Sequence, residues 1–410
     1  MTEPMTVLIN DAVACRQASG VGHYALELLY HLPFVDRDIR AVRLSQTPAG
    51  SLLRRKSKSR PRREQQGPAL RSTTPGALHQ VKQRLRSSLR YIASPLYERY
   101  LDWAVDREAR TLFHEPDATP PTCQAPTVTT INDLSVLLFP QWHPRYRVEH
   151  YERRLQTGIE RTDYYLAISS ATARDMTRLL GIPENRISVT PLAPRRHFRV
   201  LPVASVERAR KRLELPRRFL LFVGTIEPRK NVEGLLRAYG RLGNAIRSKF
   251  PLILAGGWGW HSDAVREMLR QSPWRDSVRW LGYLDDQDLV ALTNAASALV
   301  YPSFHEGFGL PPLEAMVCGC PVVTSNRSSL PEVVGDDALI VNPEDEEELT
   351  QAMREIVSHR ELADELRRRG YRRAARFSWE ETARLTARVY RQAAGLEEIY
   401  EQPIPWRRSA

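Results

Sequence analysis

The second half of the sequence alternates short apolar runs with segments of helical periodicity, and this alternation restricts the fold more than any other feature. Apolar runs at 218–224 and 298–303 are each followed by a turn and a helical segment, and further apolar runs lie at 251–257 and 278–282. Short apolar runs bounded by glycine or proline predict buried strands, and strands that alternate with helices predict a parallel sheet. The expected fold class is therefore α/β, with a doubly wound sheet.

The first half shows the same alternation less regularly. Residues 6–9 predict a buried first strand, residues 20–22 (Gly-Val-Gly) predict a loop, and residues 23–32 have helical periodicity. Strand, glycine loop and helix are the usual beginning of a Rossmann-like unit. Further strands are predicted at 127–131 and 164–170. A chain of 410 residues is too long for one ordinary core, so we expect two domains of roughly 200 residues each.

Charge and cysteine content restrict the partners. Lysine and arginine number 60 against 48 acidic residues, which gives a formal charge of +12. An excess of this size predicts an anionic partner, such as nucleic acid, acidic lipid or a phosphorylated substrate. We find no zinc-finger, RNA-recognition or comparable module, and therefore expect no nucleic acid partner. The four cysteines are too few for a disulfide framework in a chain this long, and we expect reduced thiols.

The first candidate site is the segment 224–231, which joins a predicted strand to a predicted helix. Gly224 lets the backbone approach a ligand, and the helix N-terminus presents free N–H groups. Arg229 and Lys230 add full positive charge. A diphosphate leaving group needs such charge, because its own negative charge grows as the bond to it breaks. An ordinary turn with two solvated cations explains this segment, taken alone, equally well.

The second candidate site contains two carboxylates. Glu306 is expected in the loop after a strand, and Glu314 in a helix that begins near Pro311 or Pro312, where proline is tolerated. Both carboxylates can then face one cleft at the carboxyl edge of the sheet, where α/β folds bind ligands. Carboxylates suit the vicinal hydroxyls of ribose or hexose. The alternative is a structural role, with one carboxylate at a helix start and the other on a solvated face. The glycines and prolines between the two glutamates disfavour this alternative.

These segments resemble the retaining glycosyltransferases of family 4, the group 1 enzymes with the GT-B fold, and among them the mannosyltransferases. Two glutamates separated by seven residues, as Glu306 and Glu314 are, form that family's signature. The resemblance covers most of the chain except about 45–101. It is carried by residues 19–24, 126–140, 165–176, 223–231, 301–345 and 377–391.

The resemblance implies a role for each candidate residue. Arg229 and Lys230 are expected to hold the donor diphosphate, as the chemistry of their segment also suggests. Glu306 is expected to contact the transferred sugar, and Glu314 the nucleotide ribose. Backbone groups are expected to lie against the donor at Gly20, Gly22, Gly224, Phe308, Gly309 and Leu310. For the first two of these glycines, an ordinary turn is the alternative.

One position departs from the family pattern. The family often has His-Asp where this chain has Asn132-Asp133, and that histidine usually lies beside the donor sugar. Asparagine hydrogen-bonds a hydroxyl but does not take up a proton at neutral pH, so we assign no general base. Asp133 is a candidate to orient the acceptor hydroxyl, and capping of the next segment is the alternative. No Asp-x-Asp motif lies in a metal-binding context, and we expect no metal.

The resemblance implies two Rossmann-like domains facing a cleft, with a C-terminal helix that packs back on the first domain. The expected acceptor domain is 1–198, the nucleotide-sugar domain 199–378, and the crossing helix 379–410. The expected enzyme is a hexosyltransferase without a cofactor, which uses a GDP- or UDP-linked donor, GDP-mannose being the first choice. Its expected acceptor is a glycan or lipid-linked glycan of bacterial surface polysaccharide. A sugar-nucleotide epimerase on the same fold and a basic nucleic-acid-binding protein are the alternatives.

A basic insertion interrupts the first half at about 45–100. Residues 54–63 have the sequence RRKSKSRPRR, and apolar residues between 81 and 96 fall at helical spacing with basic residues among them. We find no secretory signal and no apolar run long enough to cross a bilayer. The expected location is therefore cytoplasmic, with the insertion docking on the anionic inner face of the membrane. A disordered, solubilising insertion is the alternative.

Docking predicts that the full chain co-sediments with phosphatidylglycerol vesicles at low salt, since each basic residue near such a surface contributes about 1 kcal/mol. Deletion of 54–76 is expected to abolish co-sedimentation while transfer to a soluble acceptor persists. Intact protein that remains in the supernatant at low salt contradicts this docking.

Overall fold

The computed structural model describes residues 4–11, 20–44, 110–118, 120 and 123–396. Their contacts define two compact units. Unit 1 has described residues within 1–130, 157–164 and 387–398, and unit 2 within 131–156 and 165–386. The basic insertion at about 45–100 lies outside the described residues, so its docking stays a prediction, as do the domain boundaries at 198 and 378.

The first sheet has six strands in the order β2-β1-β3-β4-β5-β6. β1 pairs in parallel with β2 and β3, β3 with β4, and β5 with β6. All five residues of β1 are buried, which explains why Val7, Leu8 and Ile9 follow one another without alternating with polar residues. The predicted first strand and those near 127 and 164 are confirmed. The strands are Met5–Ile9, Ile39–Arg43, Thr111–Glu115, Thr127–Ile131, Tyr164–Ala167 and Ile187–Val189.

The helices of this half include α1 (Gly20–Val35), α4 (Ser135–Leu138), α5 (Arg145–Glu160) and α6 (Ser170–Leu180). The loop predicted at 20–22 is wrong, because Gly20 and Gly22 lie in the first turn of α1. Glycine has a poor intrinsic helix propensity, but propensity is a weak preference that packing overrides. Gly22 is buried in this turn.

The second sheet has six parallel strands in the order β12-β11-β10-β7-β8-β9. The chain starts this sheet at β7, continues outward through β8 and β9, and then returns to the other side of β7 with β10. The order of the strands therefore reverses between β7 and β10. The strands are Leu220–Val223, Leu252–Ala255, Val278–Gly282, Ala298–Tyr301, Val322–Ser325 and Leu339–Val341.

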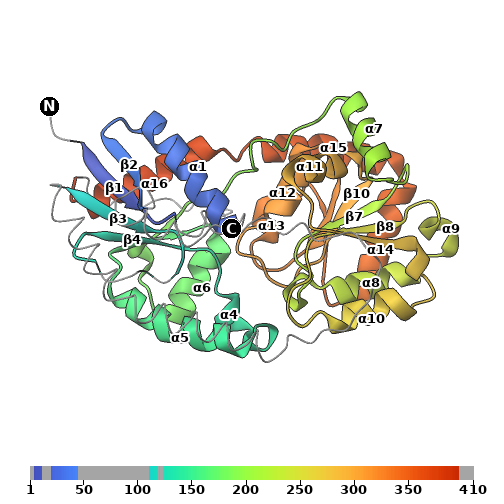
Figure 1. Cartoon of the computed structure of the whole chain (residues 1–410), viewed down its shortest axis with the longest axis horizontal. Helices are drawn as coiled ribbons and strands as arrows, with labels where there is room; N and C mark the ends of the chain where they lie inside the picture. Colours follow the sequence, from blue (N-terminus) through green and yellow to red (C-terminus); the bar gives the residue numbers. More distant parts are fainter. Residues whose placement is uncertain (1–3, 12–19, 45–109, 119, 121–122, 397–410) are drawn as a thin grey trace. The chain divides into compact units, whose positions relative to one another are not determined.

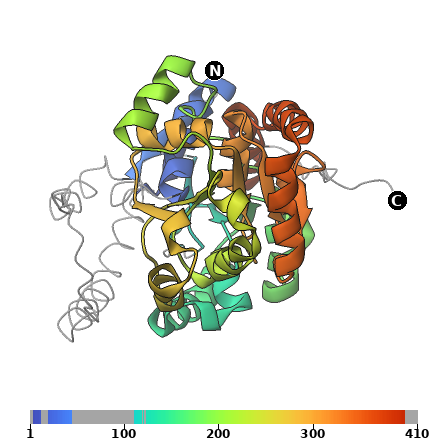
Figure 2. The same cartoon turned by 90° about the vertical axis from the view of Figure 1, so that its right-hand side faces the viewer.

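Helices cover both faces of the second sheet, as expected for a doubly wound fold. Figure 1 shows α8 and α10 on one side of the strands and α11 and α12 on the other, and α14 and α15 pack together in the orange-red part of Figure 2. The helices from this half are Val203–Arg212 (α7), Val232–Arg241 (α8), Asn244–Arg247 (α9), Asp263–Gln271 (α10), Asp286–Ala295 (α11), Leu310–Val317 (α12), Leu330–Val334 (α13), Glu346–Ser358 (α14), Arg360–Ala374 (α15) and Trp379–Ala393 (α16).

The end of the C-terminal helix belongs to unit 1, although the helix begins in unit 2. Residues from Ala387 onward are grouped with the first strands. The Tyr390 hydroxyl lies 2.6 Å from Nδ1 of buried His114, and Arg391 donates to both carboxylate oxygens of Asp36 at 2.7 and 2.9 Å. α16 is thus the predicted helix that returns to the N-terminal domain.

Candidate active site

The two predicted segments follow neighbouring strands. Residues 224–231 come directly after β7, and the loop that carries Glu306 comes directly after β10, which pairs with β7 in parallel. Parallel strands end at the same edge of a sheet, and ligands of doubly wound folds bind where the strand order reverses. The structure therefore brings both segments to the edge where a ligand site is expected.

Arg229 joins the two segments. It lies in a short 3₁₀ turn, Pro228–Lys230, that leads into α8. Its Nη1 donates to Oε2 of Glu306 and to the carbonyl oxygen of His305, both at 2.8 Å, and its Nη2 donates to Oε1 of Glu227 at 2.8 Å. The guanidinium group thus fixes one loop against the other.

Lys230 contacts the same carboxylate from a second direction. Its Nζ donates to Oε1 of Glu306 and to the Tyr301 hydroxyl, both at 2.5 Å, and that hydroxyl donates to Oε1 of Glu306 at 2.8 Å. Lys230 is 8% exposed and Glu306 is 6% exposed. Lys230, Tyr301 and Glu306 thus form a closed, buried set of hydrogen bonds. We call these three residues and Arg229 the charge cluster.

The cluster determines which of its members is charged. Burial opposes ionisation of Glu306, but Arg229 and Lys230 outweigh it, and the pKa of Glu306 falls to about 2. Burial lowers the pKa of Lys230, and Arg229 lowers it further, against the opposing effect of Glu306. Burial and the neighbouring Glu306 raise the pKa of Tyr301 well above its usual value. Glu306 is therefore a carboxylate throughout the physiological range.

The glycines next to Glu306 are required by close backbone contacts. A Cβ atom at Gly307 would collide with the backbone oxygen of Asn132, and one at Gly309 would lie 2.8 Å from Leu330 Cδ2. Gly309 also has a φ of 111°, which disfavours any residue with a side chain. The backbone at both glycines is therefore tightly packed against neighbouring segments.

Two serines missed by the sequence analysis hold this loop. The Ser329 hydroxyl donates to the carbonyl oxygens of Glu306 and Phe308 at 2.8 and 2.7 Å, and Ser328 Oγ donates to the first of these at 2.6 Å. Serine hydroxyls that hydrogen-bond to the main chain fix a loop without regular secondary structure. No sequence motif singles out serines in this role.

Glu314 has a different environment from Glu306. It lies in α12, is 3% exposed, and accepts hydrogen bonds from Arg195 Nε at 2.6 Å and Nη2 at 3.0 Å. Arg195 Nη1 donates to Asp286 at 2.7 Å. Burial raises the pKa of Glu314, against the opposing effect of Arg195. Arg195 was not predicted from the sequence, because it is 119 residues away from Glu314 along the chain.

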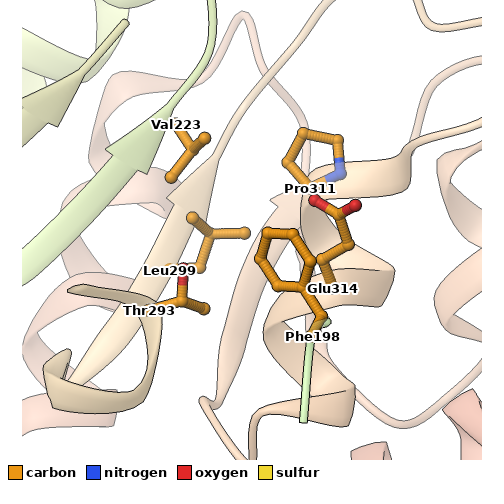
Figure 3. A pocket seen from close by; sticks show the side chains of 6 residues that line it. All are labelled: Phe198, Val223, Thr293, Leu299, Pro311 and Glu314. Atoms are coloured by element: carbon orange, nitrogen blue, oxygen red, sulfur yellow. The ribbon is translucent and has the colours of Figure 1, made fainter. Parts of the chain in front are cut away.

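A small pocket lies beside this second carboxylate. Figure 3 shows Glu314 and Pro311 of α12 near the ring of Phe198, with side chains from β7 and β10 also around the pocket. The six lining residues are Phe198, Val223, Thr293, Leu299, Pro311 and Glu314. The wall of this pocket is largely apolar and contains one carboxylate, that of Glu314. The partner of this carboxylate is Arg195, whereas the carboxylate of the charge cluster pairs with Arg229 and Lys230.

Asp133 hydrogen-bonds to Ser135, and Arg229 of the charge cluster acts on it electrostatically. Its Oδ1 accepts hydrogen bonds from the Ser135 amide at 2.9 Å and from the Ser135 hydroxyl at 2.6 Å. Burial opposes its ionisation, but Arg229, Ser135 and His305 together lower the pKa of Asp133. Asp133 thus hydrogen-bonds to the first residue of α4, although the N-cap position of this helix is Leu134 and has no side-chain cap. The carboxylate remains ionised close to Arg229.

Among the residues that the structure describes, no group of three or more His, Cys, Asp or Glu side chains is placed to hold a metal ion. Within the same ranges, none of the helices has both the length and the apolar character that a membrane crossing requires.

Comparison with known proteins identifies the family. The profile of the family described as "Glycosyl transferases group 1" matches residues 205–373. The chain is 37% identical to O-antigen chain mannosyltransferase B of Escherichia coli over 306 residues, which span 72% of this chain and 78% of that protein. It is 34% identical to the serotype-specific mannosyltransferase WbdA of Escherichia coli over 268 residues, 63% of this chain and 32% of WbdA. The chain belongs to the group 1 glycosyltransferases.

Solved structures show the same architecture. Sucrose-phosphate synthase from Thermosynechococcus elongatus superimposes with a TM-score of 0.66 over 96% of this chain and 100% of that one, at 19% identity. An identity this low is informative about the fold alone. It confirms the predicted GT-B fold, with two Rossmann-like parallel-sheet domains.

The charge cluster predicts a pH-dependent contribution to stability. Glu306→Gln removes the only carboxylate paired with buried Lys230 among the described residues and one of the two paired with Arg229, which is expected to lower the free energy of unfolding by about 3–5 kcal/mol at neutral pH. Because the pKa of Glu306 falls from 4.5 to about 2 on folding, its stabilisation is complete above the higher value and disappears as the pH falls to the lower one.

Urea unfolding of wild type and variant across this pH range measures the effect, and the two curves are expected to converge in acid. Glu267→Gln is the matched control, since Glu267 pairs with Arg270 on an exposed helix surface. Equal midpoints for Glu306→Gln and wild type at neutral pH contradict the prediction.

Proposed function

We propose that this glycosyltransferase is a retaining hexosyltransferase of family 4 that moves mannose from GDP-mannose to a glycan or lipid-linked acceptor in the synthesis of a bacterial surface polysaccharide. The observation that carries the proposal is the buried, ionised Glu306 between Arg229 and Lys230, at the sheet edge where β7 and β10 end. The choice of mannose is supported by the names of two relatives, which are mannosyltransferases.

Both cations of the cluster have hydrogen-bonding capacity left for a diphosphate. An ammonium group has three donors, and Lys230 uses two of them on Tyr301 and Glu306. Arg229 Nε is buried and has no partner among the described residues. Charge-assisted hydrogen bonds to phosphate oxygens are the strong kind. We therefore assign the donor diphosphate to these two side chains.

The two glutamates are assigned to hydroxyls of the donor. A carboxylate offers about four acceptor sites, and Arg195 occupies two on Glu314, so the vicinal hydroxyls of a ribose can share the others. Glu306 is assigned to the transferred sugar. Backbone contacts to the donor are proposed at Gly20, Gly22, Gly224, Phe308, Gly309 and Leu310.

The proposed reaction is substitution on one face of the sugar. The bond from the anomeric carbon to the β-phosphate oxygen breaks through an oxocarbenium-like state, and the acceptor oxygen bonds to the same carbon from the same side. The departing phosphate oxygen takes the acceptor's hydroxyl proton. Arg229 and Lys230 stabilise the charge that develops on the diphosphate, which requires neither a metal nor a cofactor. Asp133 orients the acceptor hydroxyl.

Donor binding tests the assignment of the phosphate site. In the presence of EDTA, GDP-mannose is expected to raise the thermal midpoint of the wild type more than other nucleotide sugars do. Lys230→Met removes a charge-assisted hydrogen bond and is expected to weaken binding by about tenfold to a hundredfold. Lys249→Met, which changes an exposed lysine, is the control. A wild type that responds to no nucleotide sugar, or only after addition of a divalent metal, contradicts the proposal.

The stereochemistry of the product tests the mechanism independently. NMR of the reaction is expected to show an α-linked mannoside as the first product from GDP-α-mannose. A β-linked first product means that the acceptor attacks from the opposite face, and it excludes the same-face substitution.

A further inference from the structure

A buried imidazole close to the charge cluster has no hydrogen-bond partner. His143 follows the 3₁₀ turn Pro140–Trp142, and only 5% of its surface is exposed. Neither Nδ1 nor Nε2 has a partner among the described residues. A buried polar group without a partner costs about 1–3 kcal/mol, so such groups are rare in folded proteins unless a ligand completes them.

The imidazole belongs to the surroundings of the charge cluster. Asp133, Glu227 and Arg229 all act on it electrostatically, and all of these residues lie within unit 2. Arg229 Nε is also buried without a partner. Two groups that interact electrostatically and both have unused hydrogen-bonding capacity indicate that polar ligand atoms belong in this place.

The charges around His143 restrict the class of ligand. Burial lowers the pKa of His143, and Arg147 lowers it further. The imidazole is therefore neutral at neutral pH, with one donor and one acceptor nitrogen. Asp133 and Glu227 repel an anion there, and Arg147 and Arg229 repel a cation. The ligand group that suits this place is therefore uncharged and both donates and accepts hydrogen bonds. A hydroxyl is such a group.

Aromatic rings next to His143 suit the apolar face of a sugar. The centroid of the Trp260 ring lies 5.8 Å from the centroid of the His143 ring. Trp260 Nε1 donates to the carbonyl oxygen of Trp142 at 2.6 Å. Both tryptophans are partly exposed. Tryptophan combines a large apolar face with a polar edge, so it can pack against the C–H groups of a pyranose while polar neighbours bind its hydroxyls.

We propose that His143 binds a hydroxyl of one of the two reacting sugars, with Trp260 beside it. The proposal rests on the proposed function, since it places a hexose at this site. The hexose belongs either to the nucleotide-sugar donor or to the acceptor, and these two sources share the same hydroxyl chemistry.

The first test separates a binding role from a structural one. His143→Phe replaces the unpartnered imidazole by an apolar ring, so its thermal midpoint is expected to equal or exceed that of the wild type. Mannosyl transfer to p-nitrophenyl α-mannoside is expected to fall by about tenfold, the order that loss of one hydrogen bond brings. His143→Gln keeps a donor and an acceptor and is expected to retain more activity. His150→Phe changes an exposed histidine and serves as the control.

The second test identifies the sugar by titration of wild type and His143→Phe with GDP-mannose and with GDP. A donor contact predicts weaker binding of GDP-mannose and unchanged binding of GDP. An acceptor contact predicts that both affinities are unchanged and that KM for p-nitrophenyl α-mannoside rises.

Two results overturn the site alone, provided that the wild type binds GDP-mannose. One is a lower thermal midpoint of His143→Phe, which indicates a structural imidazole. The other is unchanged binding and unchanged transfer in this variant. A wild type that binds neither GDP-mannose nor GDP overturns the proposed function, and this site with it.

Discussion

The ionised carboxylate of Glu306, buried between Arg229 and Lys230, is the interaction on which the site depends. Burial of any one of these charges alone is expensive, and the set is tolerated because each charge is both paired and hydrogen-bonded. The same bonds connect the loop after β7 to the loop after β10. Loss of this carboxylate therefore affects more than one contact with a substrate, because it removes two of the bonds that hold the loops together and leaves the bond from Arg229 to the His305 carbonyl oxygen.

The two glutamates of the signature are eight positions apart, and their environments differ in kind. Cations lower the pKa of Glu306, whereas burial raises that of Glu314 against the effect of Arg195. Groups whose surroundings move their pKa values apart commonly have separate tasks in one active site. The separation is consistent with our assignment of Glu306 to the transferred sugar and Glu314 to the ribose, with Arg195 as the group that orients the second carboxylate.

Polar groups with unused hydrogen-bonding capacity lie in the surroundings of the charge cluster. Arg229 Nε and both nitrogens of His143 are without partners among the described residues, and the ionised Asp133 is close to them. A polyhydroxylated substrate supplies donors and acceptors together, which no single ion does. A glycosyltransferase must hold the hydroxyls of two sugars as well as a diphosphate. The polar groups around the charge cluster are suited to this task.

The sequence alone determined the α/β alternation, because strand and helix periods and the glycines that end them are local properties of the chain. The family resemblance assigned Arg229, Lys230 and Glu306 to one donor, and the pairing of β7 with β10 in the structure brings their loops to one edge of the sheet. The start of α1 at Gly20 was missed because packing overrides glycine's weak propensity. Only the tertiary structure decided two features of the site. These are the pairing of Arg195 with Glu314 and the absence of hydrogen-bond partners for the His143 ring among the described residues. Both depend on which distant segments pack together and on the water that this packing excludes, and neither is encoded in a local pattern.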